Sequence, residues 1–290
     1  MGSNGENLVR RAAEDLVRSS YAIALTGAGM STESGLPDFR GPDGIWTKHP
    51  EAEREAYEAY DKLLQNPKAH WEEMLTPGSL FGLFFEELGK FSPNPGHYAL
   101  AKLEKMGILR LIITQNVDGL HQKAGNRNVI EYHGGLSKLR CISCGSRFDR
   151  EEFDLDRLKM EDRLPPRCKK CNGVLKYDGV YFGEPIPSDV AHQSLEEAWK
   201  CDLMLVCGTS AVIYPFAELP RIARHRRIEK ETKTETGLYV VEEKPGVIII
   251  EVNDQPTPLT DEKISDYLIQ GKTGEILPQI VAQVKQLRKS

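Results

Sequence analysis

The sequence predicts an α/β fold in which a parallel sheet is covered by helices on both faces and a smaller module is inserted into the chain. Four short apolar runs alternate with stretches of helical periodicity, at residues 21–26, 108–114, 202–207 and 247–252. Short runs that are apolar on both sides are typical of buried parallel strands. Residues 41–91 and 137–177 break this rhythm, and we expect them to form the inserted module.

Helix signals surround these expected strands. Residues 5–19 carry their apolar side chains on one face, which predicts an amphipathic helix before the first strand. Ahead of the second strand, Asn94 is placed as an N-cap, Pro95 begins the helix and Gly107 lies just past its end. The charged segment 221–246 is expected to be a solvated helix end followed by a loop.

The composition is that of a globular protein. The 290 residues are 40% hydrophobic and 28% charged, with a formal net charge of −5. That charge gives no electrostatic footprint for nucleic acid, so we expect no direct nucleic-acid binding. No apolar run reaches the roughly 18–20 residues of a membrane span, and the N-terminus lacks the apolar stretch of a signal peptide. We therefore expect a cytoplasmic monomer without membrane contact.

Four of the six cysteines form two C-x-x-C pairs in polar sequence: Cys141 with Cys144, and Cys168 with Cys171. Each turn brings two thiolates to one tetrahedral metal ion, and four thiolates leave no position open for water or substrate. The pattern predicts one structural zinc ion. Free cysteines or disulfides are the alternative, and a reducing compartment disfavours disulfides. A zinc ribbon that binds nucleic acid without catalysis is less favoured, because the segment lacks a basic and aromatic stripe.

A glycine-rich turn, residues 27–31, follows the first strand. Glycines at such a position let the backbone approach a phosphate with free N–H groups pointing at it, although an ordinary tight turn is the alternative. Thr32 stands where the dinucleotide fingerprint G-x-G-x-x-G has its last glycine, which counts against an NAD-dependent dehydrogenase. Asp38, Phe39 and Arg40 then place charges of both signs and an aromatic ring beside the turn, which is unusual for a loop without a function.

Polar side chains also follow the second strand. Gln115, Asn116 and Asp118 emerge where ligands of open α/β sheets bind, beyond the carboxyl ends of the strands. His133 lies just before the first cysteine pair. Histidine titrates near neutral pH and suits a general base, although a lone histidine is more often structural.

Together these motifs resemble those of the sirtuins, the NAD⁺-dependent protein deacylase family. The matching segments run in the same order over nearly the whole chain: GAGMSTESGLPDFR (27–40), TQNVDGLHQKAG (114–125), EYHGG (131–135), the two C-x-x-C pairs, YFGE (181–184), CGTSAVIYP (207–215) and VN (252–253). The resemblance implies a Rossmann-like NAD-binding domain of residues 1–40, 92–136 and 178–290. It implies a small helical and zinc-ribbon domain of residues 41–91 and 137–177.

The resemblance also assigns roles to single residues. His133 is implied as the general base, and Asn116 as a second catalytic residue. NAD⁺ is implied as a co-substrate held by Gly27, Ala28, Gly29, Ser31, Asp38, Phe39, Arg40, Gln115, Asn116, Asp118, Gly208, Thr209, Ser210, Asn253 and Thr273. The substrate backbone is implied to pair as an added strand with the segment that contains Val180, Phe182, Gly183 and Glu184. His97 and His121 match family positions but are interpreted as packing or capping residues.

The implied function is NAD-dependent protein lysine deacetylation or deacylation, in which the acyl group passes to ADP-ribose and nicotinamide is released. Acyl-lysine proteins or peptides are the implied substrates. Protein mono-ADP-ribosylation on the same scaffold is the alternative, and the intact H-G and F-G-E motifs favour deacylation. Met74 and Pro77 stand where sirtuins that prefer acidic acyl groups carry a Tyr-x-x-Arg pair, so we expect acetyl-lysine to be preferred over succinyl-lysine. Ala211 and Phe216 depart from the family pattern beside the adenosine pocket.

Overall fold

A computed structural model describes residues 3–39, 41, 44–76, 90–225, 229–233, 239–243 and 246–289. The main helices are α1 (Ser3–Arg18), α2 (Ile45–Lys48), α3 (Pro50–Gln65), α4 (Pro67–Met74), α6 (Pro95–Lys105), α7 (Leu120–Ala124), α8 (Leu155–Met160), α9 (Ser188–Lys200), α10 (Glu218–His225), α11 (Pro258–Asp261) and α12 (Thr273–Leu287). The strands are β1 (Ala22–Thr26), β2 (Leu109–Thr114), β3 (Val129–Glu131), β4 (Lys138–Cys141), β5 (Arg147–Asp149), β6 (Leu175–Tyr177), β7 (Leu203–Cys207), β8 (Glu229–Lys233), β9 (Tyr239–Glu243), β10 (Ile248–Asn253) and β11 (Tyr267–Gln270).

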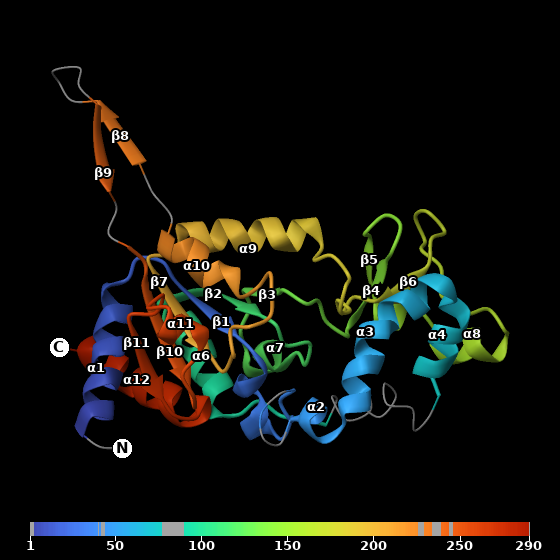
Figure 1. Ribbon diagram of the computed structural model, residues 1–290, viewed down its shortest axis with the longest axis horizontal. Coiled ribbons are helices and arrows are strands. Elements are labelled where there is room, and N and C mark those ends of the chain that lie inside the picture. Colours follow the sequence, from blue (N-terminus) through green and yellow to red (C-terminus); the bar gives the residue numbers. More distant parts are fainter. Residues whose placement is uncertain are drawn as a thin grey trace.

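Six of these strands form one parallel sheet in the order β11-β10-β7-β1-β2-β3 (Figure 1). Side chains alternate across it: Ala22 and Ala24 of β1 enter the apolar core on one face, and Ile23 and Leu25 enter the core on the other. Helices α1, α6 and α12 contribute to the first core, and α9 and α10 contribute to the second. The predicted Rossmann-like sheet with helices on both faces is confirmed.

The helix before β2 begins and ends where the sequence predicts. The Asn94 side chain accepts hydrogen bonds from Gly96 N (2.9 Å) and His97 N (3.4 Å), and His97 Nδ1 accepts one from Asn94 N (3.3 Å). This reciprocal cap satisfies backbone N–H groups that the first turn of a helix leaves without partners. Gly107, just past the end of α6, has φ +71°, a conformation that favours glycine.

A second, smaller sheet lies beside the first. Strands β5, β4 and β6 are antiparallel in that order, and helices α3, α4 and α8 lie around them (Figure 1). Trp71 of α4 is fully buried in one apolar cluster with Leu139 of β4 and Leu175 of β6, and its Nε1 donates to Leu175 O (2.8 Å). Two stretches that are far apart in the sequence therefore share one apolar core. The domain boundaries given above remain a prediction.

The charged segment before β10 differs from the expectation. Helix α10 continues past Arg221 to His225, and β8 and β9 then pair as an antiparallel hairpin with Thr232 opposite Val240. Figure 1 shows this hairpin projecting away from the large sheet near α10. The prediction of a loop is wrong for residues 229–233 and 239–243: Thr232, Val240 and Val241 are β-branched, and such residues favour strand pairing even in a charged segment. None of the helices in the described ranges is long and apolar enough to cross a bilayer.

Candidate active site

The carboxyl ends of adjacent strands of the large sheet meet at one edge. Gly27 N, just after β1, donates to Cys207 O at the end of β7 (3.2 Å), and Gly208 N donates to Val252 O of β10 (3.0 Å). On the other side of β1, Gln115 N donates to the last carbonyl oxygen of that strand (2.9 Å). The structure therefore brings together the glycine turn, the residues after β7, the end of β10 and the polar segment after β2, which the sequence presents as separate motifs.

The glycines of this edge allow two turns to pack backbone against backbone. A Cβ at Gly208, where φ is +58°, would lie 2.3 Å from Met30 N, and a Cβ at Gly27 would lie 2.7 Å from Thr209 Cβ. Gly29 N donates to Gly208 O (2.8 Å). The expectation of free N–H groups is wrong for Gly27 and Gly29, since both are bonded within the protein. Glycine is needed here because any side chain would prevent the turn after β1 from packing against the turn after β7.

A hydrogen-bonded network fixes the polar side chains at this edge. Asn116 Nδ2 donates to the carbonyl oxygen of Gly27 (3.0 Å) and to Ser31 Oγ (3.1 Å). Ser31 Oγ in turn donates to Asp118 Oδ2 (2.7 Å). Because these polar groups hold one another in place, they need little reorganisation when a ligand arrives.

Several other residues predicted to hold the cofactor lie at the same edge of the sheet. Gln115 Nε2 donates to Thr209 Oγ1 (3.0 Å), which ties the segment after β2 to the turn after β7. Thr273 Oγ1, at the start of α12, donates to Gly29 O (3.4 Å). Asn253 Nδ2 donates to Gln255 O (2.9 Å) at the end of β10. Ala28 lies in the glycine turn itself, and Ser210 is exposed beside Thr209.

The segment that follows the glycine turn is described in part. Asp38 Oδ1 accepts a hydrogen bond from Gly41 N (2.9 Å), which closes a short turn. The Phe39 side chain is 41% exposed, and its ring centroid lies 5.0 Å from that of Trp46. Arg40 and Pro77, both named in the sequence analysis, lie outside the described residues.

His133 lies just after the edge strand β3, between aromatic rings. Its ring centroid is 5.6 Å from that of Tyr132 and 6.4 Å from that of Phe216. Burial lowers the pKa of His133 to about 4, and a hydrogen bond with the backbone of Gln115 opposes this shift. The imidazole is therefore neutral near pH 7 and available to accept a proton.

The backbone beside His133 contacts the segment that follows β6. Val180 N donates to His133 O (2.7 Å). Gly134 has φ +69°, and a Cβ at this position would lie 2.1 Å from Asp178 O. The H-G pair therefore holds the segment with Val180, Phe182 and Gly183 close to the candidate base.

His97 and His121 are buried and lie against each other. Their ring centroids lie 4.9 Å apart, and His121 Nε2 lies 2.9 Å from Thr26 Oγ1. Burial lowers the pKa of His97 to about 4 and that of His121 to about 3. His97 Nδ1 also closes the cap of α6, which confirms the capping interpretation for His97, and its Nε2 lies 3.5 Å from Ser31 Oγ of the hydrogen-bonded network. His121 Nδ1 is buried without a hydrogen-bond partner among the described residues, so the interpretation of His121 as a packing residue stays a prediction.

An aromatic cluster that the sequence does not predict connects the segment after the glycine turn to the segment after β6. Phe182, after β6, lies with its ring centroid 5.3 Å from Trp46 and 4.7 Å from Tyr57. Trp46 also contacts Phe39, so the cluster joins the segment after the glycine turn to the segment that follows β6. Phe182 is far from Trp46 and Tyr57 in the sequence, and no local pattern in one chain indicates such contacts.

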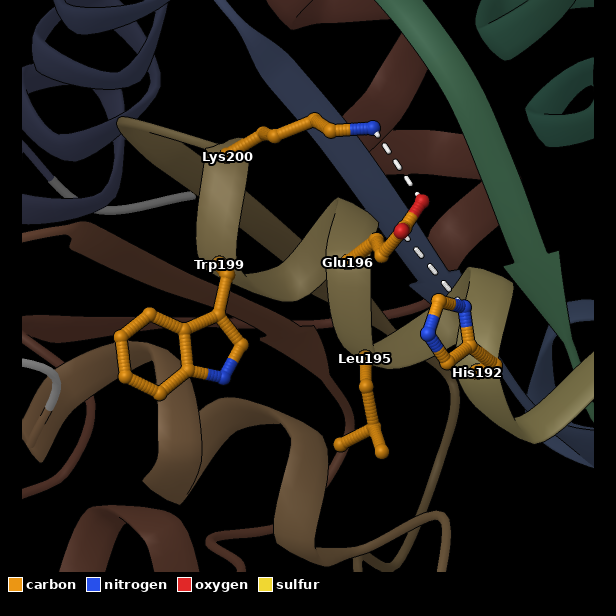
Figure 2. A pocket seen from close by; sticks show the side chains of 5 residues that line it. All are labelled: His192, Leu195, Glu196, Trp199 and Lys200. Atoms are coloured by element: carbon orange, nitrogen blue, oxygen red, sulfur yellow. Dashed lines mark ion pairs between the residues drawn. The ribbon is translucent and has the colours of Figure 1, made fainter.

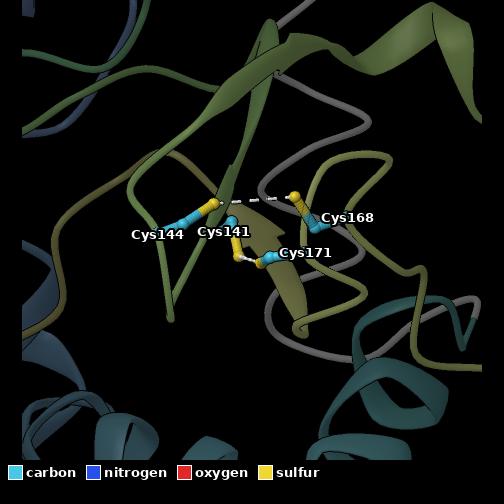
Figure 3. Close-up of side chains that lie close together, drawn as sticks. All are labelled: Cys141, Cys144, Cys168 and Cys171. Atoms are coloured by element: carbon cyan, nitrogen blue, oxygen red, sulfur yellow. Dashed lines mark hydrogen bonds between the residues drawn. The ribbon is translucent and has the colours of Figure 1, made fainter.

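The four cysteines of the small sheet converge on one point (Figure 3). All four Sγ atoms lie within 4.8 Å of one another, with Cys141 and Cys171 3.5 Å apart and Cys144 and Cys168 3.7 Å apart. A tetrahedral zinc ion with Zn–S bonds of about 2.3 Å requires S–S edges of about 3.8 Å. The geometry therefore fits the predicted structural zinc.

The two cysteine turns have the same local conformation. In each pair the amide of the second following residue, Ser143 or Lys170, donates to the first thiolate at 3.4 Å. The residue after the second cysteine is left-handed in both, Gly145 at φ +69° and Asn172 at φ +61°. Glycine and asparagine are the residues that adopt this conformation most readily. The local sequence thus gives both turns the conformation in which their two cysteines can bind one metal ion.

A hollow on the outer side of α9 contains none of the predicted site residues. It is lined by His192, Leu195, Glu196, Trp199 and Lys200 (Figure 2). Glu196 lies 3.5 Å from His192 and 3.6 Å from Lys200, as expected for side chains four residues apart on a helix. The polar groups that converge at the sheet edge therefore make that edge, and not this hollow, the candidate active site.

Comparison with known proteins gives one consistent result. The model of the Sir2 family matches residues 27–215. The NAD-dependent protein deacylase 2 of Archaeoglobus fulgidus is 42% identical over 284 residues, covering 98% of each chain. Among solved structures, a Sir2 homologue in complex with NAD is 36% identical with a TM-score of 0.70, covering 97% of this chain and 94% of its own. Sir2Af2 bound to a myristoylated histone peptide is 38% identical with a TM-score of 0.64, covering 98% and 99%.

Proposed function

The chain belongs to the Sir2 family, and from that premise we propose that its sheet-edge site removes acyl groups from lysine side chains of proteins with consumption of NAD⁺. The observation that carries the proposal is the arrangement around His133. The His133 imidazole is hydrogen-bonded to the Gln115 backbone, and the backbone carbonyl oxygen of His133 accepts a hydrogen bond from Val180 N. His133 thus connects the segment with Gln115, which is proposed to bind NAD⁺, to the segment with Val180, which is proposed to bind the peptide.

NAD⁺ is proposed to lie across the carboxyl ends of the strands. The turn after β7, with Gly208, Thr209 and Ser210, takes the adenosine half together with Asn253 and Thr273. The glycine turn (Gly27, Ala28, Gly29 and Ser31) and the following residues Asp38, Phe39 and Arg40 take the pyrophosphate and nicotinamide side. Gln115, Asn116 and Asp118 contact the ribose and the carboxamide. The hydrogen bonds of this network support the assignment, because they join all three groups of residues at one edge.

The acyl-lysine peptide is proposed to pair as an added strand with the backbone from Val180 to Glu184. The relative bound to a myristoylated histone peptide supports a substrate of this class. Phe182 and the aromatic side chains around it then lie beside the incoming lysine. We also propose that the protein acts as a monomer in the cytoplasm, without membrane or nucleic-acid partners. The net charge of −5 argues against a nucleic-acid partner.

The residues of the site suit the chemistry of this family. NAD⁺ supplies the ribose carbon to which the acyl oxygen bonds as nicotinamide leaves. His133 takes a proton from a ribose hydroxyl, and proton transfer by a positioned group is worth roughly 10²–10⁴-fold in rate. Asn116 is the second catalytic residue, held in place by its bonds to Gly27 and Ser31. The closed four-thiolate zinc site holds the small sheet together and takes no part in the reaction.

The substitution His133→Ala tests the assignment of the base. We expect deacetylation to fall by at least 10²-fold while the affinity for ADP-ribose stays within twofold of wild type. His192→Ala is the matched control, because His192 lies on the outer side of α9 with its side chain 76% exposed. A loss of less than tenfold in folded His133→Ala protein would be too small for an essential base and would refute the assignment.

A further inference from the structure

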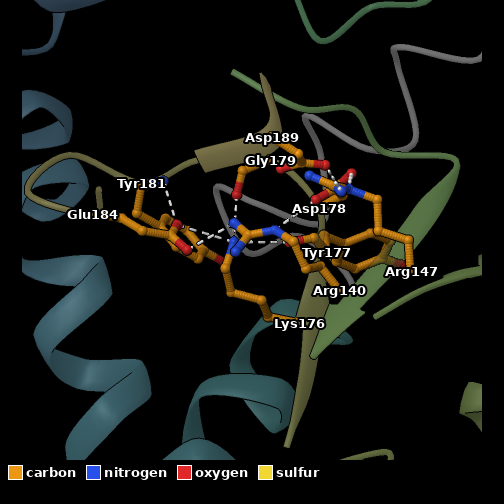
Figure 4. Close-up of polar contacts among 9 residues, drawn as sticks. All are labelled: Arg140, Arg147, Lys176, Tyr177, Asp178, Gly179, Tyr181, Glu184 and Asp189. Carbon is orange, nitrogen blue, oxygen red and sulfur yellow. Dashed lines mark hydrogen bonds and ion pairs between the residues drawn. The ribbon is translucent and has the colours of Figure 1, made fainter. Parts of the chain in front are cut away.

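The side chain of Glu184 points into the protein, and three donors hold its carboxylate (Figure 4). Oε1 accepts a hydrogen bond from Arg140 Nη2 (2.7 Å). Oε2 accepts one from Tyr181 N (2.9 Å) and lies 3.0 Å from Lys176 Nζ. Only 4% of the Glu184 side chain is exposed, so the carboxylate is not presented to a peptide on the surface.

Glu184 also closes the turn to which it belongs. Its backbone N donates to Tyr181 O (3.1 Å), and Gly183 has φ +78° at the third position of this turn. A positive φ at that position defines a turn that requires glycine. The carboxylate bonds back to Tyr181 N, so the turn is fixed by its backbone and its last side chain together. Phe182, at the second position, is thereby directed at the rings of Trp46 and Tyr57.

Both cations come from strands of the small sheet. Arg140 is the residue before Cys141 in β4, and Lys176 lies in β6, which leads directly into the peptide segment. Lys176 Nζ donates to Tyr177 O (2.9 Å) and Gly179 O (2.5 Å), so it holds the backbone immediately before Val180. Its side chain is only 1% exposed. Lys176 is therefore a buried cation that fixes the backbone leading into the peptide-binding segment.

The network continues along the small sheet through Asp178. Its carboxylate accepts hydrogen bonds from Arg140 Nε (2.6 Å) and Arg147 Nε (2.8 Å). Arg147 Nη1 then donates to Asp189 Oδ2 (2.6 Å), and the Asp189 side chain is 63% exposed. The network therefore has a buried end at Glu184, which belongs to the turn, and an exposed end at Asp189, which lies outside it at the start of α9.

We propose that Glu184 is a positioning residue, which together with Lys176 and Arg140 sets the shape of the peptide-binding segment and thereby the affinity for acyl-lysine peptides. The inference rests on the proposed function and deepens it. Glu184 acts through the backbone from Tyr181 to Gly183, and its carboxylate does not touch the substrate. A buried ion pair need not stabilise a protein more than well-packed apolar residues would. The directional bonds of Glu184 to Arg140 and Lys176 instead select one conformation of the turn.

The experiment compares Glu184→Gln with Asp189→Asn in the full chain. Each change removes one carboxylate charge and keeps the side-chain shape, the first at the buried end of the network and the second at its exposed end. Calorimetry measures the dissociation constants of an acetyl-lysine peptide and of ADP-ribose, and steady-state kinetics measure KM and kcat. For Glu184→Gln we expect the peptide Kd and KM to rise at least tenfold, with kcat at saturating peptide and the ADP-ribose Kd within threefold of wild type. Asp189→Asn should leave all four quantities within twofold.

Two results would overturn the inference. One is a Glu184→Gln protein that binds the peptide as wild type does. The other is a parallel loss of peptide and ADP-ribose affinity, which would indicate general destabilisation. If Glu184→Gln does not fold, Glu184→Asp keeps the charge but is one methylene shorter, and the same two outcomes apply to it. Wild-type protein that neither binds the acetyl-lysine peptide nor releases nicotinamide would refute the proposed function itself, which separates that failure from failure of this inference.

Discussion

Replacing Gly134 by alanine adds a methyl group where the chain has no room for one. The new Cβ would lie 2.1 Å from Asp178 O and 2.7 Å from Asp178 C, both backbone atoms that no side-chain rotation can move. Ordinary contact begins near 3.4 Å, so the two segments must separate by about 1.3 Å. Because Val180 is bonded to His133 O in the same place, this movement carries the peptide segment away from the proposed base.

The structure gives the size of the effect. A residue other than glycine at φ +69° costs about 1–2 kcal/mol, and overpacking of this kind typically costs a further 1–3 kcal/mol. We therefore expect Gly134→Ala to lower the free energy of unfolding by about 2–5 kcal/mol. A displacement of about 1 Å in a catalytic arrangement costs on the order of 10²-fold in rate, so kcat/KM for an acetyl-lysine peptide should fall by a similar factor.

Two neighbouring glycines provide matched controls. Gly183 has φ +78° but nothing within 4 Å of an added Cβ, so Gly183→Ala tests the backbone penalty alone, about 1–2 kcal/mol. Gly179 lies outside the left-handed region, and its added Cβ would meet Leu136 Cδ2 at an ordinary 3.7 Å. Urea unfolding of the three variants should rank Gly134→Ala as the most destabilised and Gly179→Ala as nearly neutral, and peptide kinetics should compare Gly134→Ala with Gly179→Ala only, because Gly183 belongs to the peptide-binding segment. Equal losses in the free energy of unfolding for Gly134→Ala and Gly183→Ala would refute the argument from the contact with Asp178.

Three further predictions concern the metal, the acyl group and the pH. Cys168→Ser or zinc chelation should unfold the small sheet, since structural zinc contributes an apparent binding free energy of about 10–16 kcal/mol in isolated zinc fingers. Metal analysis that finds no zinc in well-folded wild-type protein would contradict this prediction. Succinyl-lysine should be at least tenfold poorer than acetyl-lysine in kcat/KM on one peptide sequence. Met74 lies against the Tyr181 hydroxyl and Arg140 is already paired with Glu184, so neither residue offers a cation to the succinyl carboxylate. Comparable rates would show that this argument from charge is wrong. Burial lowers the pKa of His70, His97 and His133 to about 4 and that of His121 to about 3, so the unfolded chain binds more protons than the folded one between roughly pH 4 and 6.5. The free energy of unfolding should therefore fall as the pH is lowered through that window, and a flat urea-unfolding profile from pH 7.5 to 5 would contradict this.

The large sheet and the cysteine site were predictable because their signals are local. A buried strand is apolar over a few consecutive residues, as in β7, and a metal turn places two cysteines three residues apart. The cap of α6 is local as well, since Asn94 bonds to Gly96 and His97 within one turn. Such patterns depend on neighbours in the chain, which one sequence displays in full.

The surroundings of the site were less predictable, because they depend on residues that meet only in the folded chain. Phe182 was expected to contact substrate, but its packing on Trp46 and Tyr57 follows from how α2 and α3 meet the segment after β6. The F-G-E motif pointed to Glu184 as a substrate contact, and the direction of its side chain depends on Arg140, 44 residues away. The order of the motifs predicts which segments form the site, and tertiary packing determines which of their atoms lie at the sheet edge.

The central claim is that this site transfers an acyl group to ADP-ribose, and the products of one reaction test it most directly. Purified protein is incubated with NAD⁺ and an acetyl-lysine peptide, and mass spectrometry follows all species against a reaction without peptide. We predict that nicotinamide, deacetylated peptide and acetylated ADP-ribose form in equal amounts and only when the peptide is present. Nicotinamide release with the acetyl group still on the peptide, together with a peptide or protein that has gained ADP-ribose, would contradict deacylation and identify an ADP-ribosyltransferase instead.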